Sequence, residues 1–136
     1  MFECIFCKIV DKSVPSFKVF EDEDAMAFLD INPSAPGHTI VITKKHVKDI
    51  FEIDELSLRR TVGTVKLVAD RIKTHLGADV MILQNNGRFA GQIIEHFNFH
   101  LIPRKENDGI HFIHKPFRLP EEEMKAMAEK LGKAAA

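Results

Sequence analysis

The segment 96–101 alternates polar and apolar residues without exception. In an extended strand, positions two apart lie on the same face, so the polar members share one face and the apolar members the other. The apolar members can enter a core, while the polar members form a row of imidazole and amide groups. Such a row, backed by aromatic rings, indicates a functional surface. The polar members are His96, Asn98 and His100, and the apolar members are Phe97, Phe99 and Leu101.

Both cysteines of the chain, Cys4 and Cys7, lie in one Cys-x-x-Cys motif near the N-terminus. In an intracellular protein this spacing indicates metal binding or redox chemistry rather than a structural disulfide. Two cysteines supply only half of a tetrahedral zinc site, so the site needs two further ligands.

The histidine-containing strand and its surroundings resemble the signature of the histidine triad (HIT) family, in which His-φ-His-φ-His-φ-φ follows a Gly-Gln pair. Here the pair is Gly91 and Gln92. The resemblance covers residues 4–104 and is to the Hint-like branch, whose members hydrolyse nucleoside phosphoramidates. The middle histidine of the family is the catalytic nucleophile, and this chain has Asn98 at that position. The resemblance also implies a two-fold dimer with the sheets joined across the interface.

A subset of the family binds a structural zinc through four side chains, and the resemblance carries this ligand set to Cys4, Cys7, His46 and His96. A zinc ion here would tie the N-terminal segment to two strands. The alternative is two buried, reduced cysteines beside two hydrogen-bonded histidines.

The resemblance further implies a pocket for a purine nucleotide. Apolar side chains near the N-terminus would sandwich the base, and Asp30 would accept hydrogen bonds from both ribose hydroxyls. Asn85 would assist at the sugar–phosphate side, while Gly91, Gln92 and His100 would contact the phosphate. Taken singly, each residue fits a core, cap or turn role better, but together and in this order they favour nucleotide binding. The implied residues are Ile5, Phe6, Ile9, Phe28, Asp30, Asn85, Gly91, Gln92, Ile93, Asn98 and His100.

Two of these positions depart from the family. An amide nitrogen is neither a nucleophile nor a useful base, so Asn98 removes the group that would form the nucleotidyl-histidine intermediate. Ile93 stands where relatives commonly carry Ser or Thr. The catalytic set implied by resemblance is therefore Asn98 (the replaced nucleophile), His100 and Gln92. The change is either an engineered knock-out or a natural loss of catalysis, and the sequence alone leaves both open.

Three functions follow from these residues. The first is a purine nucleotide-binding protein whose family chemistry, hydrolysis of adenosine 5'-phosphoramidates, is crippled by Asn98. The second is a non-catalytic nucleotide- or partner-binding module. The third is a dinucleoside polyphosphate hydrolase, another activity within the family.

Chain length, net charge and the lengths of the apolar runs indicate the broad class of the protein. A chain of 136 residues suits one domain, 1–136, with the motif-bearing part at 4–104 and a C-terminal tail and helix at 105–136. The formal net charge of -1 does not support binding of nucleic acid through a broad basic surface. No apolar run is long enough to span a membrane, and no signal peptide is evident, so we expect a soluble cytoplasmic protein.

The periodicities predict an α+β fold with a mostly antiparallel sheet of about five strands. A long helix is predicted between the cap residues Asp54 and Gly77, because apolar residues recur there at three- and four-residue steps. A short helix is expected around the cysteines, and a final helix after Pro120. Strands are predicted at 17–20, 25–29, 38–43, 79–84 and along the histidine-containing segment, which a tight turn at 85–88 precedes, with a possible short edge strand at 110–113.

Overall fold

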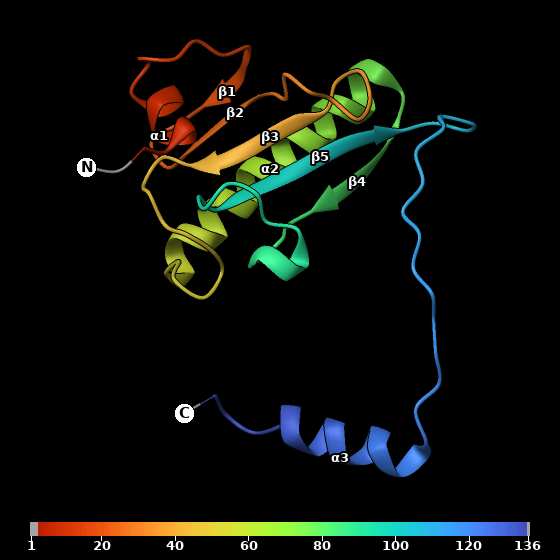
Figure 1. The fold of residues 1–136 in the computed structure, drawn as a ribbon. Helices are drawn as coiled ribbons and strands as arrows, with labels where there is room; N and C mark the ends of the chain where they lie inside the picture. Colours follow the sequence, from red (N-terminus) through yellow and green to blue (C-terminus); the bar gives the residue numbers. More distant parts are fainter. Residues whose placement is uncertain (1–2, 136) are drawn as a thin grey trace.

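The computed structural model describes residues 3–135 and has an α+β architecture (Figure 1). Its five-stranded sheet is antiparallel throughout, with the strand order β1-β2-β3-β5-β4. The predicted fold class is therefore confirmed. Within residues 3–135, no helix is long and apolar enough to cross a membrane. The elements are α1 (Ile5–Val10), β1 (Lys18–Glu21), β2 (Ala25–Leu29), β3 (Thr39–Thr43), α2 (Glu55–Leu76), β4 (Asp79–Leu83), the 3-10 helix η1 (Arg88–Ala90), β5 (Asn98–Arg104) and α3 (Glu121–Leu131).

The sheet is covered on both faces, which explains why β2 and β3 read as continuous apolar runs rather than alternating ones. On one face, the apolar stripe of α2 packs on alternate residues of the central strands. On the other face, Phe6 and Ile9 of α1 pack with Met26, Phe28 and Ile40. The short helix α1 is thus fixed to the sheet by core contacts, and it brings Cys4 and Cys7 with it.

Helix α2 begins and ends where its cap residues predict. The side chain of Asp54 accepts a hydrogen bond from the Ser57 N–H at 2.8 Å. At the other end, Gly77 adopts the left-handed conformation with φ 62° and donates its N–H to the Lys73 carbonyl.

The approach to the histidine-containing strand differs from the sequence prediction. Strand β5 begins at Asn98, so His96 precedes the ladder, and the connection from β4 contains η1 rather than a tight turn. The alternation of side chains between the two faces nevertheless continues through His96 and Phe97, because the Phe97 N–H donates to the Val47 carbonyl at 2.8 Å. His96 and Phe97 are both fully buried.

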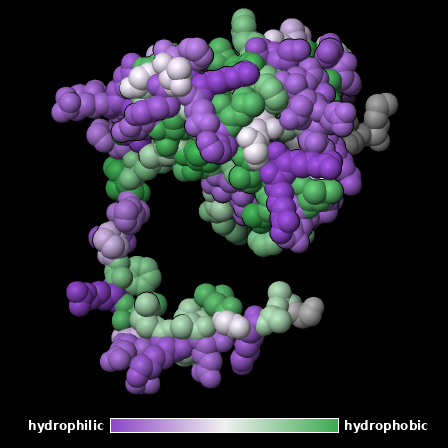
Figure 2. Space-filling model, turned by 180° about the vertical axis from the view of Figure 1, so that it is seen from behind, coloured by the Kyte–Doolittle hydropathy of each residue, from purple (hydrophilic) through white to green (hydrophobic). Residues whose placement is uncertain are grey.

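The predicted edge strand at 110–113 is wrong. Residues 105–120 form an extended connection without strand pairing, and α3 stands away from the sheet at its end (Figure 1). Both long sides of β5 already pair with β3 and β4, so the chain leaving β5 has no free strand beside it. Helix α3 is amphipathic: Figure 2 shows apolar side chains gathered on its side facing the sheet, and Met124, Met127 and Leu131 are exposed.

Candidate functional site

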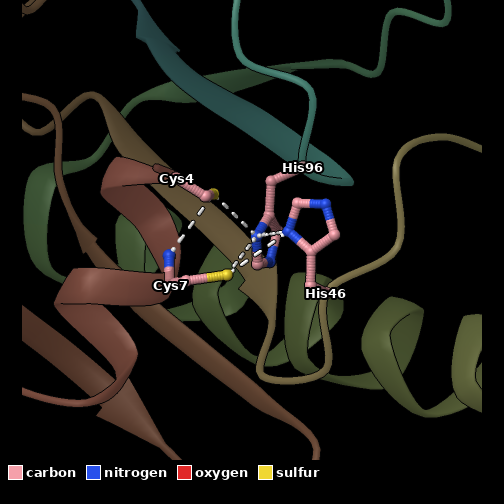
Figure 3. A group of neighbouring side chains, drawn as sticks. All are labelled: Cys4, Cys7, His46 and His96. Carbon is pink, nitrogen blue, oxygen red and sulfur yellow. Dashed lines mark hydrogen bonds between the residues drawn. The ribbon is translucent and has the colours of Figure 1, made fainter. Parts of the chain in front are cut away.

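Four potential metal ligands meet where α1, the 44–48 loop and the start of the histidine-containing segment come together (Figure 3). The Cys7 Sγ lies 3.3 Å from His46 Nδ1 and 3.6 Å from His96 Nδ1. The Cys4 Sγ lies 3.3 Å from His96 Nδ1, and the two Nδ1 atoms are 3.2 Å apart. Zinc bonds of about 2.1 Å to nitrogen and about 2.3 Å to sulfur imply tetrahedral edges of about 3.4–3.8 Å. The donor set therefore fits a zinc ion.

The hydrogen bonds of His96 favour the same conclusion. Its Nε2 donates to the Thr43 carbonyl at 2.7 Å, which leaves Nδ1 unprotonated and directed at the cysteines. Burial and the neighbouring Cys4 raise the pKa of the Cys7 thiol to about 11. A divalent cation would reverse this effect by stabilising the thiolate. Metal binding at this site would therefore release the proton of the Cys7 thiol, while His96 Nδ1 offers its lone pair directly.

A cavity of about 430 Å³ lies between α1, the loop after β2 and the start of β5. All eleven residues that the sequence assigned to a nucleotide pocket line this one cavity. One end is apolar, with Phe6 and Phe28 in edge-to-face contact at 5.6 Å between ring centroids. The other end carries Asp30, Asn98 and His100. The sequence reasoning did not include the lining residues Val14, Pro15, Ser16, Leu29, Ile31, Asn32, Ile40 and Ile94.

His38 is a site residue that sequence reasoning missed. It is 4% exposed, and its Nε2 lies 2.9 Å from His100 Nδ1 and 3.6 Å from an Asp30 oxygen. The Ser34 N–H donates to His38 Nδ1 at 3.0 Å, so Nε2 carries the hydrogen and donates to His100. His100 must then hold its own hydrogen on Nε2. Burial lowers the pKa of both imidazoles, which Asp30 partly offsets.

Asn98 is buried at the first position of β5. Its Nδ2 donates to the His96 carbonyl at 2.7 Å, so the carboxamide is held in one orientation from within its own segment. His100 is the one titratable residue of β5 that also lines the cavity. The arrangement can bind an anionic group through neutral donors, but Asn98 offers no attacking nitrogen.

The amide of Gln92 is placed differently from the sequence expectation, which gave its head to a phosphate. Its Nε2 donates to the Lys48 carbonyl at 2.7 Å and to the Ile94 carbonyl at 3.2 Å, and its Oε1 accepts from the Gly87 N–H at 2.9 Å. Both amide hydrogens are therefore used within the protein. Gln92 lines the cavity, but its amide holds the surrounding loops together.

Comparison with known proteins identifies the family of the chain. The HIT domain family matches residues 11–107.

The chain belongs to the HIT family.

Three proteins similar to this HIT protein match it over nearly the whole of both chains. It is 37% identical to a Schizosaccharomyces pombe protein named adenosine 5'-monophosphoramidase hnt1, covering 94% of this chain and 95% of that one. A solved HIT family structure from Bacillus subtilis is 34% identical with a TM-score of 0.89, covering 99% of both chains. A structure titled as a Zn-bound histidine triad family protein from Mycobacterium smegmatis is 30% identical with a TM-score of 0.76, covering 94% of this chain and 96% of that one.

Proposed function

We propose that this HIT protein binds a purine nucleoside monophosphate in the cavity between α1 and β5. The observation that carries the proposal is the convergence of all eleven sequence-assigned residues on one cavity of about 430 Å³. The volume is in the range of small-molecule sites, which combine apolar walls with a few polar groups. The phosphoramidase name of the S. pombe relative supports the same ligand class.

The polarity of the cavity sets the orientation of the ligand. The base lies against Ile5, Phe6 and Ile9 at the apolar end, and the ribose hydroxyls donate to Asp30. The Asp30 carboxylate retains acceptor capacity, although Oδ1 already accepts from the Asn32 N–H at 2.8 Å. The phosphate then lies near His100, whose Nε2–H is available as a neutral donor.

We further propose that the family reaction, hydrolysis of adenosine 5'-phosphoramidates, is impaired in this chain. The reaction needs a nucleophile that forms a covalent intermediate, and Asn98 occupies that position by resemblance. Ground-state binding does not depend on the nucleophile, so its loss lowers turnover and leaves the affinity for the nucleotide unchanged. The fixed carboxamide of Asn98 favours the second candidate, a non-catalytic nucleotide- or partner-binding module, over a dinucleoside polyphosphate hydrolase.

Zinc is the proposed structural cofactor, held by Cys4, Cys7, His46 and His96. Ligand distances close to tetrahedral edges support this assignment, as does the Zn-bound relative from M. smegmatis. Its role is to join α1 to the loop after β3 and to the segment before β5.

A homodimer is the proposed assembly. Strand β4 lies at one edge of the sheet, and Ile82 on it is 47% exposed. An exposed apolar edge strand is a template for pairing with another strand, and an isologous pair would join two sheets. The exposed apolar face of α3 offers further surface to a second copy.

Isothermal titration of AMP and GMP into the protein tests nucleotide binding. We expect saturable heat with either ligand, together with a rise in melting temperature. An Ile9→Asp variant places a carboxylate at the base end and should abolish the heat. Its control is Val62→Asp on the exposed side of α2. Absence of heat and of stabilisation at millimolar nucleotide would contradict the proposal.

A further inference from the structure

Cys4 and Cys7 lie at the start of α1 in a geometry that suits a disulfide as well as a metal site (Figure 3). The potential ligand atoms of the Cys/His cluster, both sulfurs included, all lie within 4.8 Å of one another, and the Cys7 N–H donates to the Cys4 Sγ at 3.4 Å. Cys4 is the N-cap of the helix, and Cys7 follows three residues later. Helical Cα atoms at this spacing are about 5 Å apart, which is within the range that a disulfide spans. The two sulfurs can therefore bond to each other without a large movement of the backbone.

The Cys/His cluster is accessible from one side. A cavity of about 600 Å³ is lined by Cys4 and His46, together with residues of the 48–52 loop and of the 93–95 segment. Cys7 and His46 are each only partly buried. This cavity gives a small reactant in solution access to the cluster.

The two residues between the cysteines, Ile5 and Phe6, line the base end of the nucleotide cavity. The Phe6 ring makes edge-to-face contacts with Phe28, at 5.6 Å between ring centroids, and with His96, at 5.8 Å. One aromatic ring thus contacts both a wall of the nucleotide cavity and a member of the Cys/His cluster. A change in the bonding of the cysteines acts directly on this ring, because Phe6 lies between them in the chain.

We propose that the Cys4–Cys7 pair is an oxidation site for hydrogen peroxide, and that the disulfide formed there releases the zinc ion and lowers the affinity for the nucleotide. This inference rests on the proposed zinc site and on the proposed nucleotide binding. In the zinc-bound protein both sulfurs are thiolates. One thiolate attacks the peroxide to give a sulfenic acid and hydroxide, and the second thiolate then displaces another hydroxide to form the disulfide. Each sulfur gives up one electron, and the two electrons cleave the O–O bond of the peroxide.

Oxidation replaces a long-range link by a local one. A shared metal ion joins Cys7 to His46 and His96, which lie 39 and 89 positions further along the chain. A Cys4–Cys7 disulfide closes only the short loop of the motif itself, so it restrains little of the chain. It also removes two of the four zinc ligands, and the remaining two histidines do not complete a tetrahedral site. We therefore expect the oxidised protein to lose both the zinc ion and the link between α1 and the two histidine-bearing segments.

Treatment of the zinc-loaded protein with hydrogen peroxide tests this site through three readouts: the mass of the intact chain, zinc release to a chromogenic chelator, and AMP calorimetry. We expect a mass lower by about 2 Da, because disulfide formation removes the two thiol hydrogens. Zinc release should be stoichiometric with the disulfide, and AMP should bind about fivefold or more weakly. Dithiothreitol with added zinc should restore all three values. Methionine oxidation instead raises the mass, and dithiothreitol does not reverse it.

Cys7→His supplies a fourth zinc ligand without a second sulfur, so it separates the disulfide from other effects of peroxide. Whatever zinc content and AMP affinity this variant has before peroxide should be unchanged after it. The wild-type cycle of oxidation and reduction decides the question if the variant does not fold.

The inference is wrong if wild-type protein keeps its zinc and its mass under peroxide, or if the disulfide forms while the affinity for AMP stays the same. It is also wrong if peroxide weakens AMP binding to Cys7→His as much as to wild type. If the reduced wild-type protein holds no zinc or binds no AMP, the proposed function fails instead.

Discussion

The carboxamide Nδ2 of Asn98 donates to the backbone carbonyl of His96 at 2.7 Å. His96 turns its Nδ1 to the cysteines, while its carbonyl orients Asn98, which lines the nucleotide cavity. One residue therefore belongs to both the candidate metal centre and the candidate nucleotide site. We therefore expect that disorder at the metal centre also disorders the Asn98 carboxamide, because the His96 carbonyl accepts its hydrogen bond.

Metal analysis of protein purified without chelators should show one zinc per chain. Cys7→Ser should lower the melting temperature by about 10 °C or more, because metal binding contributes directly to folding. Treatment with a chelator should bring wild type close to the variant, and it should weaken AMP binding through His96. Protein without zinc, with both thiols freely titratable, would contradict the metal assignment.

The pair His38 and His100 predicts a pH dependence of stability. Burial lowers the pKa of both imidazoles below the ordinary value of 6.5, so the folded state binds fewer protons than the unfolded chain in mildly acidic solution. Their contribution is full above pH 6.5 and is lost as the pH falls through the lowered values. His38→Gln should therefore lose less stability than wild type between pH 7.5 and 5.5, in chemical denaturation at fixed zinc.

His111→Gln is the control for this experiment, because His111 is exposed in the extended 105–120 connection. Parallel pH profiles for wild type and His38→Gln would show that the imidazole pair has no such role.

Asp30→Ala should weaken binding of AMP more than binding of 2'-deoxy-AMP. Loss of the carboxylate removes two hydrogen bonds to the ribose but only one to the deoxyribose, and each unpaired group costs about 1–3 kcal/mol when buried. Calorimetry with both ligands measures the difference. Asp70→Ala, an exposed change on α2, is the control. Equal losses for both ligands would place the ribose elsewhere.

Local patterns predicted most of the fold, and the family resemblance named residues that the structure brings together in one cavity and one Cys/His cluster. The apolar spacing between Asp54 and Gly77 fixes a helix, and the joint presence of Cys-x-x-Cys with His46 and His96 indicates a metal centre. The repeat of the helix and the Cys-x-x-Cys spacing are visible in the sequence directly, whereas His46 and His96 were assigned as ligands through the family resemblance.

The roles of His38 and Gln92 could not be predicted in the same way. His38 was predicted only as the first residue of the strand at 38–43, and it is the pairing of β3 with β5 that brings it to His100. Gln92 reads as a ligand-binding amide, but the fold brings the Lys48 and Ile94 carbonyls to it first. The strand predicted at 110–113 is absent for a related reason. A strand needs a free strand beside it, and the sequence does not show that β5 already pairs with β3 and β4.

Ile82→Asp on the β4 edge should convert the proposed dimer to a monomer. A charge on the exposed face of an edge strand opposes pairing with a second copy. Sedimentation velocity measures the change, and Phe17→Asp, beside β1 at the opposite edge of the sheet, is the control. A monomeric wild type, or a dimeric Ile82→Asp variant, would contradict assembly through β4.

The most direct measurement compares wild type with Asn98→His, mixed with an adenosine 5'-phosphoramidate and stopped by rapid quench for mass spectrometry. We expect wild type to bind the ligand without a covalent adduct or turnover. The variant should show a nucleotidyl-enzyme adduct and release AMP, with the gain mainly in kcat and with similar affinity. Turnover by wild type at the variant's rate would contradict the assigned role of Asn98, as would a variant that binds normally and stays inert.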